Sequence, residues 1–100
     1  MYTYIWEYYV KDDFVSEFEN IYRPDGPWVR LFKEGKGYIK TELHQVIENK
    51  TRFLTIDFWT SKSAYDSFRK QFSEEFEELD KVGETLTKKE IHLGSFHCFE

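Results

Sequence analysis

The sequence predicts an α+β fold of the ferredoxin-like type, formed by one domain over residues 1–100 with the element order β-α-β-β-α-β. Three observations predict it. The length suits one hydrophobic core. Two runs of alternating apolar and polar residues are joined by a short polar turn, which indicates a hairpin. On each side of this hairpin, an amphipathic stretch with helical spacing lies between it and a further strand. Right-handed crossovers around such a hairpin give a four-stranded antiparallel sheet with helices on one face.

The chain is expected to begin with a strand and a helix. Tyr2–Val10 is aromatic and β-branched except at Glu7, which is typical of a strand that is apolar on both faces. Asp12 or Asp13 is well placed to cap the helix that follows. Its apolar residues recur at i, i+4, i+7 and i+8 and form one face: Phe14, Phe18, Ile21 and Tyr22.

A break and a second short helix are expected next. The sequence RPDGP at 23–27 interrupts the first helix, and Pro27 suits the first turn of a new one capped by Asp25. Trp28, Leu31 and Phe32 share one side of this helix, which Gly35 or Gly37 closes.

A hairpin follows the helix pair. Residues alternate between apolar and polar over Tyr38–Ile47 and again over Phe53–Thr60, with Glu48-Asn49-Lys50 between them. Both runs are therefore predicted to be strands of one antiparallel pair.

The last third is predicted to hold one long amphipathic helix and a final strand. Ser61 or Ser63 caps the helix, Gly83 ends it, and Leu86-Thr87 links it to a strand over Glu90–Phe99. Its apolar line runs through Ala64, Tyr65, Phe68, Phe72, Phe76, Leu79 and Val82.

Charge and cysteine content exclude several classes of protein. The net charge is -5, and no basic run is large enough for nucleic acid, so no nucleic-acid partner is expected. The longest segment without a charged residue, Ile91–Phe99, is too short for a membrane span, so no membrane partner is expected. A lone Cys98 fits a reducing cytoplasm. The three histidines lack metal-site spacing, and no metal is expected.

Aromatic residues are unusually frequent, with ten Phe, seven Tyr and three Trp in 100 residues. Such side chains each bury about 150–250 Å², which together exceeds what a small core holds, so some should line a pocket or an interface. Since Tyr4, Trp6 and Tyr8 lie on one face of the first strand, and Ile5 and Tyr9 on the other, the face away from the helices is expected to meet a second copy.

The sequence resembles the antibiotic biosynthesis monooxygenase family, in particular small members that pair into a dimeric α+β barrel. The resemblance spans nearly the whole chain and rests on these segments: Ile5-Trp6-Glu7-Tyr8, Val10-Lys11, Tyr22, Asp25-Gly26-Pro27-Trp28, Leu31-Phe32, Gly37-Tyr38, Thr41-Glu42-Leu43, Asp57-Phe58-Trp59-Thr60-Ser61, Ala64-Tyr65, Phe68 and Glu90. It implies a homodimer and cofactor-free oxygenation of a small aromatic or quinol-like molecule. Haem-degrading relatives use an Asn, a Trp and a His, of which only Trp59 has a counterpart here, so that activity is not expected.

Cofactor-free oxygenation needs a base and donors for the anion that forms. Asp57 and Glu7 are the candidate bases, because an acid in apolar company has a raised pKa. The alternative for each is a buried carboxylate satisfied by a donor such as Arg30 or Arg52. The candidate substrate-binding residues, which ordinary core packing would also explain, are Trp59, Trp28, Tyr22, Tyr38 and Phe32. A non-catalytic dimeric module that binds a small hydrophobic ligand is the alternative function.

Overall fold

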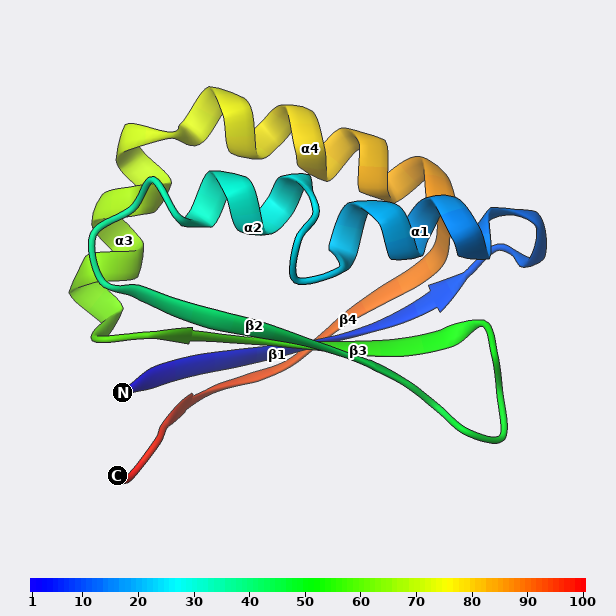
Figure 1. The fold of residues 1–100 in the computed structure, drawn as a ribbon, viewed down its shortest axis with the longest axis horizontal. Helices are drawn as coiled ribbons and strands as arrows, with labels where there is room; N and C mark the ends of the chain where they lie inside the picture. Colours follow the sequence, from blue (N-terminus) through cyan, green and yellow to red (C-terminus); the bar gives the residue numbers. More distant parts are fainter.

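The computed structural model describes all 100 residues and has the predicted α+β ferredoxin-like order (Figure 1). Its elements are β1 (Tyr2–Val10), the 3-10 turn η1 (Asp12–Phe14), α1 (Val15–Tyr22), α2 (Pro27–Phe32), β2 (Tyr38–Gln45), β3 (Arg52–Trp59), α3 (Lys62–Gln71), α4 (Ser73–Leu86) and β4 (Thr87–His97).

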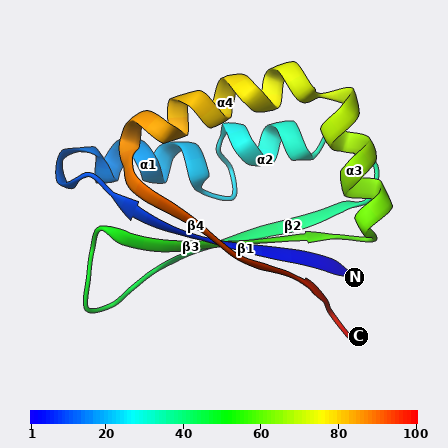
Figure 2. The ribbon, with the colours of Figure 1, turned by 180° about the vertical axis from the view of Figure 1, so that it is seen from behind.

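The four strands form one antiparallel sheet in the order β2-β3-β1-β4. All helices cover the same face, as the views from the front and from behind agree (Figures 1 and 2). We call the helix-covered face the inner face and the opposite one the outer face. The predicted sheet and its single helical layer are thereby confirmed.

Pairing register decides which side chains share the inner face. Tyr4 pairs with Asp57 and Tyr8 with Phe53, and all four side chains are buried. Trp59 is completely buried on the same face and packs against Phe68 of α3. Because side chains alternate along a strand, the odd-numbered residues of β3 face the helices and the even-numbered ones face outward.

The predicted long helix is two helices, and its predicted end is wrong. The chain bends at Phe72, whose φ of -115° and ψ of 32° lie outside the helical region, so that α4 runs back over α1 and α2 (Figure 1). Gly83 does not end the helix but lies buried within α4, where an added Cβ would collide with the Tyr22 hydroxyl. The glycine is required by this close approach. The final strand begins at Thr87 without a link, three residues earlier than predicted.

The predicted carboxylate caps are also wrong, whereas the serine cap is confirmed. Neither η1 nor α1 has a side-chain cap, and Gly26 rather than Asp25 precedes α2. Asp25 instead accepts a hydrogen bond at its backbone oxygen from Arg30 Nη1 (2.8 Å). Ser61 Oγ accepts from the Ala64 backbone N–H (3.1 Å) and begins α3.

No helix of the chain is long and apolar enough to cross a membrane.

Candidate active site

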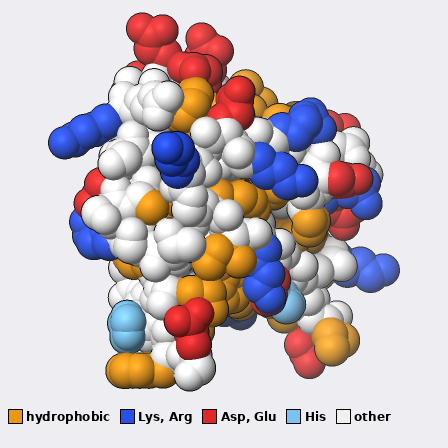
Figure 3. Space-filling view, turned by 60° about the vertical axis from the view of Figure 1, so that its left-hand side comes forward, with side chains coloured by type: hydrophobic (Ala, Val, Ile, Leu, Met, Phe, Trp, Pro, Cys, Tyr) orange, Lys and Arg blue, Asp and Glu red, His pale blue; other side chains and the backbone are white.

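A cavity of about 580 Å³ lies between the inner face of the sheet and the helices. This volume falls within the usual range for small-molecule sites, about 300–1,000 Å³. On the face shown in Figure 3, hydrophobic side chains gather in the middle and charged ones stand mainly around the edge. The cavity lining comes from all layers of the fold: Tyr4, Trp6, Tyr8, Tyr22, Trp28, Phe32, Thr41, Thr55, Asp57, Tyr65, Arg69, Phe76, Asp80, Glu84, Thr87, Lys88, Lys89 and Glu90.

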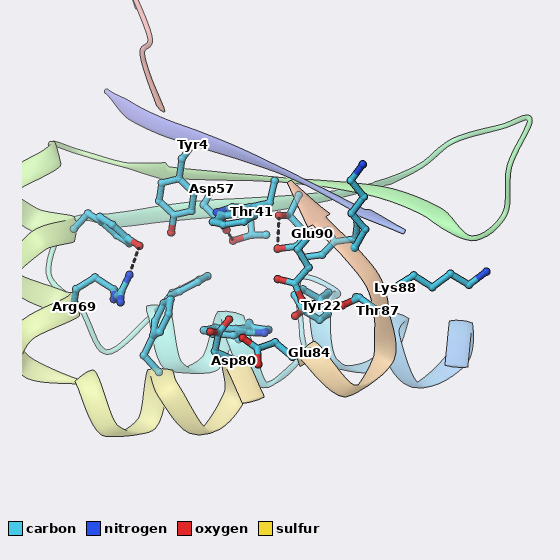
Figure 4. A pocket seen from close by; sticks show the side chains of 18 residues that line it. Tyr4, Tyr22, Thr41, Asp57, Arg69, Asp80, Glu84, Thr87, Lys88 and Glu90 are labelled. Carbon is cyan, nitrogen blue, oxygen red and sulfur yellow. Dashed lines mark hydrogen bonds between the residues drawn. The ribbon is translucent and has the colours of Figure 1, made fainter. Parts of the chain in front are cut away.

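Asp57 is the acid that β3 contributes to the wall of this cavity (Figure 4). Its residue is only 5% exposed, and none of the six ion pairs of the chain includes it. Burial raises the pKa of its carboxyl from 3.8 to about 7, although a hydrogen bond from the Thr41 hydroxyl acts in the opposite direction. A carboxyl with this pKa can exchange a proton near neutral pH.

Thr41 connects Asp57 to a second hydroxyl. Thr41 lies opposite Asp57 in the pairing of β2 with β3. Its Oγ1 donates to Asp57 Oδ1 and lies 2.7 Å from the Tyr38 hydroxyl. Since Thr41 donates its proton to Asp57, Tyr38 is the donor in the second bond. Tyr38, Thr41 and Asp57 therefore form a short chain of hydrogen bonds that leads from a half-buried tyrosine to a buried acid.

Two tyrosines of β1 supply hydroxyls beside Asp57. Tyr4 Oη accepts a hydrogen bond from Trp59 Nε1 (3.3 Å), and Tyr8 Oη accepts one from Thr55 Oγ1 (3.4 Å). Burial raises the pKa of both hydroxyls well above 10, and the negative charge of Asp57 acts in the same direction. Both therefore keep their protons and can act as donors to an oxyanion.

Glu7, the other candidate base, does not line the cavity. It lies on the outer face opposite Leu54 in the strand register, and its Oε2 accepts from Arg52 Nε (2.8 Å) and Nη2 (2.5 Å). The side chain of Glu7 is 9% exposed and that of Arg52 is 40% exposed. The structure thus gives Glu7 the arginine partner that the sequence offered as its alternative.

The aromatic candidates divide into two groups. Trp28, Tyr22 and Phe32 line the cavity, whereas Trp59 and Tyr38 do not. Trp59 packs in the core against Phe32 and Phe68 and reaches the site through the Tyr4 hydroxyl.

Sequence reasoning missed the lining residues of β1 and Thr41. Alternation had already placed Tyr4, Trp6 and Tyr8 together on one face of β1. Only the register, with Tyr4 opposite Asp57 and Trp6 opposite Thr55, shows that this face is the cavity floor. No group of three His, Cys, Asp or Glu side chains lies close enough to hold a metal ion.

Comparisons with known proteins agree with this architecture. The family model described as antibiotic biosynthesis monooxygenase matches residues 1–81. The fold is similar to that of SnoaB, a cofactor-independent oxygenase from Streptomyces nogalater, with a TM-score of 0.81 at 18% identity over 99% of this chain and 93% of that one. A protein of Nitrosomonas europaea proposed to be an antibiotic biosynthesis monooxygenase gives a TM-score of 0.78 at 14% identity, with both chains covered completely. A comparison with curated proteins gives no match.

Proposed function

The chain belongs to the antibiotic biosynthesis monooxygenase family, and from this premise we propose that it is a cofactor-independent monooxygenase acting on a small aromatic or quinol-like substrate. The observation that carries the proposal is Asp57, a buried carboxyl without a cationic partner whose pKa is raised to about 7 at the wall of an aromatic cavity. SnoaB, which shares the fold, is described as a cofactor-independent oxygenase.

In the proposed reaction the substrate reduces oxygen itself. Asp57 removes a proton from a ring CH₂ group that a conjugated carbonyl acidifies, as in an anthrone or the keto form of a phenol, and the charge moves onto the oxygen of that carbonyl. The hydroxyls of Tyr4 and Tyr8 donate to that oxygen and stabilise the anion.

The anion then passes one electron to O₂, and the substrate radical and superoxide combine through a new C–O bond. The peroxide picks up a proton and loses water as the second C–H bond of the same carbon breaks. The sum is R₂CH₂ + O₂ → R₂C=O + H₂O. Carbon gives up all the electrons that oxygen takes, so this reaction needs neither a reductant nor a metal.

Oxygen uptake tests the proposal directly. The wild-type protein and Asp57→Asn would be mixed with a panel of hydroquinones, naphthols and anthrones in an oxygen electrode. We expect uptake above the uncatalysed rate for the wild type and a loss of about 10²–10⁴-fold in Asp57→Asn, the usual contribution of a general base.

The matched control is Glu7→Gln, which removes the outer-face carboxylate and is expected to leave uptake unchanged. Equal rates for wild type and Asp57→Asn would overturn the role of Asp57. Tight binding of these molecules without any uptake would instead favour a non-catalytic ligand-binding module.

We further propose that the outer face pairs with the same face of a second copy. Its strands bring apolar side chains together in register, with Ile5 opposite Ile56 and the exposed Phe96 beside Thr3. Burying this face would remove an apolar surface from water, and the expected interface is on the scale of obligate dimers, roughly 2,000 Å² or more.

Light scattering coupled to size-exclusion chromatography checks the dimer. A species of twice 12.2 kDa is expected at micromolar concentration, and Ile56→Lys should convert it to monomers without unfolding the inner face. A wild-type monomer at these concentrations would contradict the pairing.

A further inference from the structure

A chain of hydrogen bonds links Asp57 to a residue outside the cavity. Asp57 is only 5% exposed, and the Thr41 hydroxyl is the one hydrogen-bond donor that the chain gives to its carboxyl. Thr41 Oγ1 in turn lies 2.7 Å from the hydroxyl of Tyr38, which does not line the cavity. The cavity wall is therefore connected through Thr41 to a residue beyond it.

An irregularity of β2 aims Tyr38 at Thr41. Side chains three residues apart on a regular strand point to opposite faces of the sheet. The register between β2 and β3 shifts between Tyr38 and Lys40. Tyr38 therefore lies opposite Trp59 and packs against its ring on the inner face, with 5.3 Å between the ring centres. Thr41 lies opposite Asp57 on the same face, so the contact between the two hydroxyls depends on this bulge, a device that is common beside active sites.

Tyr38 is the least buried of the tyrosines on which the charge of Asp57 acts. The hydroxyls of Tyr4 and Tyr8 are almost completely buried, whereas that of Tyr38 is half-buried. Burial raises the pKa of the Tyr38 hydroxyl, the hydrogen bond with Thr41 opposes this effect, and the charge of Asp57 adds to it. Tyr38 therefore keeps its proton over the range in which Asp57 titrates.

This connection leads away from the mouth of the cavity. The exposed residues of the cavity lining belong to α3, α4 and β4: Arg69, Glu84, Lys88 and Lys89. β4 and β2 are the two opposite edges of the sheet. A molecule that fills the cavity from the β4 side separates Asp57 from water at the mouth, but it leaves the connection through Tyr38 at the β2 edge open.

The two hydroxyls can pass a proton along, because each is both a donor and an acceptor. Protonated Asp57 gives its proton to Thr41 Oγ1, Thr41 gives its own to Tyr38 Oη, and Tyr38 gives its own to water. Each hydroxyl ends with one proton, the carboxyl becomes a carboxylate, and a water molecule becomes a hydronium ion. Tyr38 then donates to Thr41 and Thr41 to Asp57, which is the order of donors that the Thr41–Asp57 bond requires.

We propose that Thr41 and Tyr38 form a proton path between Asp57 and solvent at the β2 edge, which operates while an aromatic molecule fills the cavity. Tyr38 acts through Asp57 and is a positioning residue. The inference deepens the proposed function and rests on it, because the path serves Asp57 as the base. Near neutral pH about half of the molecules hold a protonated Asp57, and the path lets these regain the carboxylate with the substrate in place.

Infrared spectroscopy after a rapid pH jump tests the path without any oxygen chemistry. The jump is made under argon from below to above pH 7, and the carboxyl band of Asp57 is identified by its absence from Asp57→Asn. Each protein would be measured empty and saturated with 1-naphthylmethanol, an aromatic alcohol that does not titrate in this range and whose binding calorimetry verifies. In the wild type we expect the ligand to leave the rate of proton release from Asp57 nearly unchanged.

Variants interrupt the path at two points. Tyr38→Phe removes the outer hydroxyl and Thr41→Val the middle one, both with little change of shape. In each variant the ligand should slow proton release by about tenfold or more relative to the same variant without ligand, because the cavity is then the main route left. A merely structural effect would slow release equally with and without ligand. Tyr9→Phe, which removes a tyrosine hydroxyl from the outer face, is the matched control and should behave as the wild type.

Proton release from Tyr38→Phe that the ligand does not slow would overturn the path, because Asp57 would then reach water by another route. A wild type that the ligand slows as much as Tyr38→Phe would also overturn it. No binding of the alcohol at millimolar concentration would overturn both proposals, since nothing would then close the cavity. Oxygen uptake separates the two otherwise: a protein that shows the expected release rates but consumes no oxygen would refute the oxygenase and leave the path standing.

Discussion

Replacing Asp57 by Asn should make the protein more stable at alkaline pH. The folded protein holds this carboxyl in a cavity wall with a pKa of about 7, whereas the ordinary value is 3.8. Ionising it therefore requires the folded state to carry a buried charge that the unfolded chain would expose to water. Asn keeps the size of the side chain and still accepts from the Thr41 hydroxyl, but it never ionises.

The magnitude follows from the two pKa values. Between about pH 4 and 7 the folded state binds the proton and the unfolded state has released it, so the free energy of unfolding falls as pH rises. A difference of about three units corresponds to about 4 kcal/mol. Asp57→Asn should therefore have the same free energy of unfolding as wild type below pH 4. Its advantage should grow between pH 4 and 7 and level off at up to about 4 kcal/mol above pH 7.

Urea unfolding of both proteins at pH 3.5, 5.5 and 8.5 measures the difference between their free energies of unfolding. The contributions of the other titrating groups are the same in both proteins and cancel in this difference. Asp13→Asn, at an exposed acid of η1, is the control and should change stability by less than about 0.5 kcal/mol at each pH. A variant less stable than wild type at pH 8.5, or a difference that does not change with pH, would refute the argument that burial dominates the environment of Asp57.

Three further changes are expected to have measurable effects. Thr41→Val removes the hydrogen bond that favours ionised Asp57, so the acidic limb of the oxygen-uptake profile should move to higher pH; a shift to lower pH would contradict the bond. Gly83→Ala should destabilise by about 1–3 kcal/mol through collision with the Tyr22 hydroxyl, and thermal melts should show most of this loss recovered in a Tyr22→Phe background. Arg52→Met should lower the free energy of unfolding measured with urea, because it leaves a buried carboxylate on the outer face without its partner; a neutral result would show that the ion pair contributes nothing.

The fold could be predicted because its main signals are local. Alternation over β2 and β3 and the helical spacing of Phe18 and Tyr22 depend on near neighbours in the chain. The errors arose where a distant contact decides the outcome. Gly83 was predicted to end a helix, yet it lies within α4, where the missing side chain makes room for the distant Tyr22 hydroxyl. The bend at Phe72 likewise interrupts an apolar pattern that continues across it.

The candidate site could be predicted only in part for the same reason. Asp57 and Trp59 are two residues apart, so alternation along a strand places them on one face, and both are buried beneath the helices. Alternation could not indicate that Trp59 itself would be covered by Tyr4, because that depends on the pairing of β1 with β3. The sequence pattern did not single out Asp80 or Glu84, and only the return of α4 over the cavity brings them into the lining together with Glu90 of β4.

Two acids that were equivalent in the sequence show what distinguishes a stabilising carboxylate from a reactive one. Glu7 and Asp57 both lie on central strands among aromatic residues, and both are more than nine-tenths buried. Glu7 has a guanidinium within 2.5 Å, which compensates its charge. Asp57 has a single neutral hydroxyl, so its ionisation lowers the stability of the fold. An arginine beside Asp57 would remove this cost and, by lowering the pKa, would also make it a weaker base. Asp57 therefore combines a cost in stability with a basicity suited to proton exchange near neutral pH.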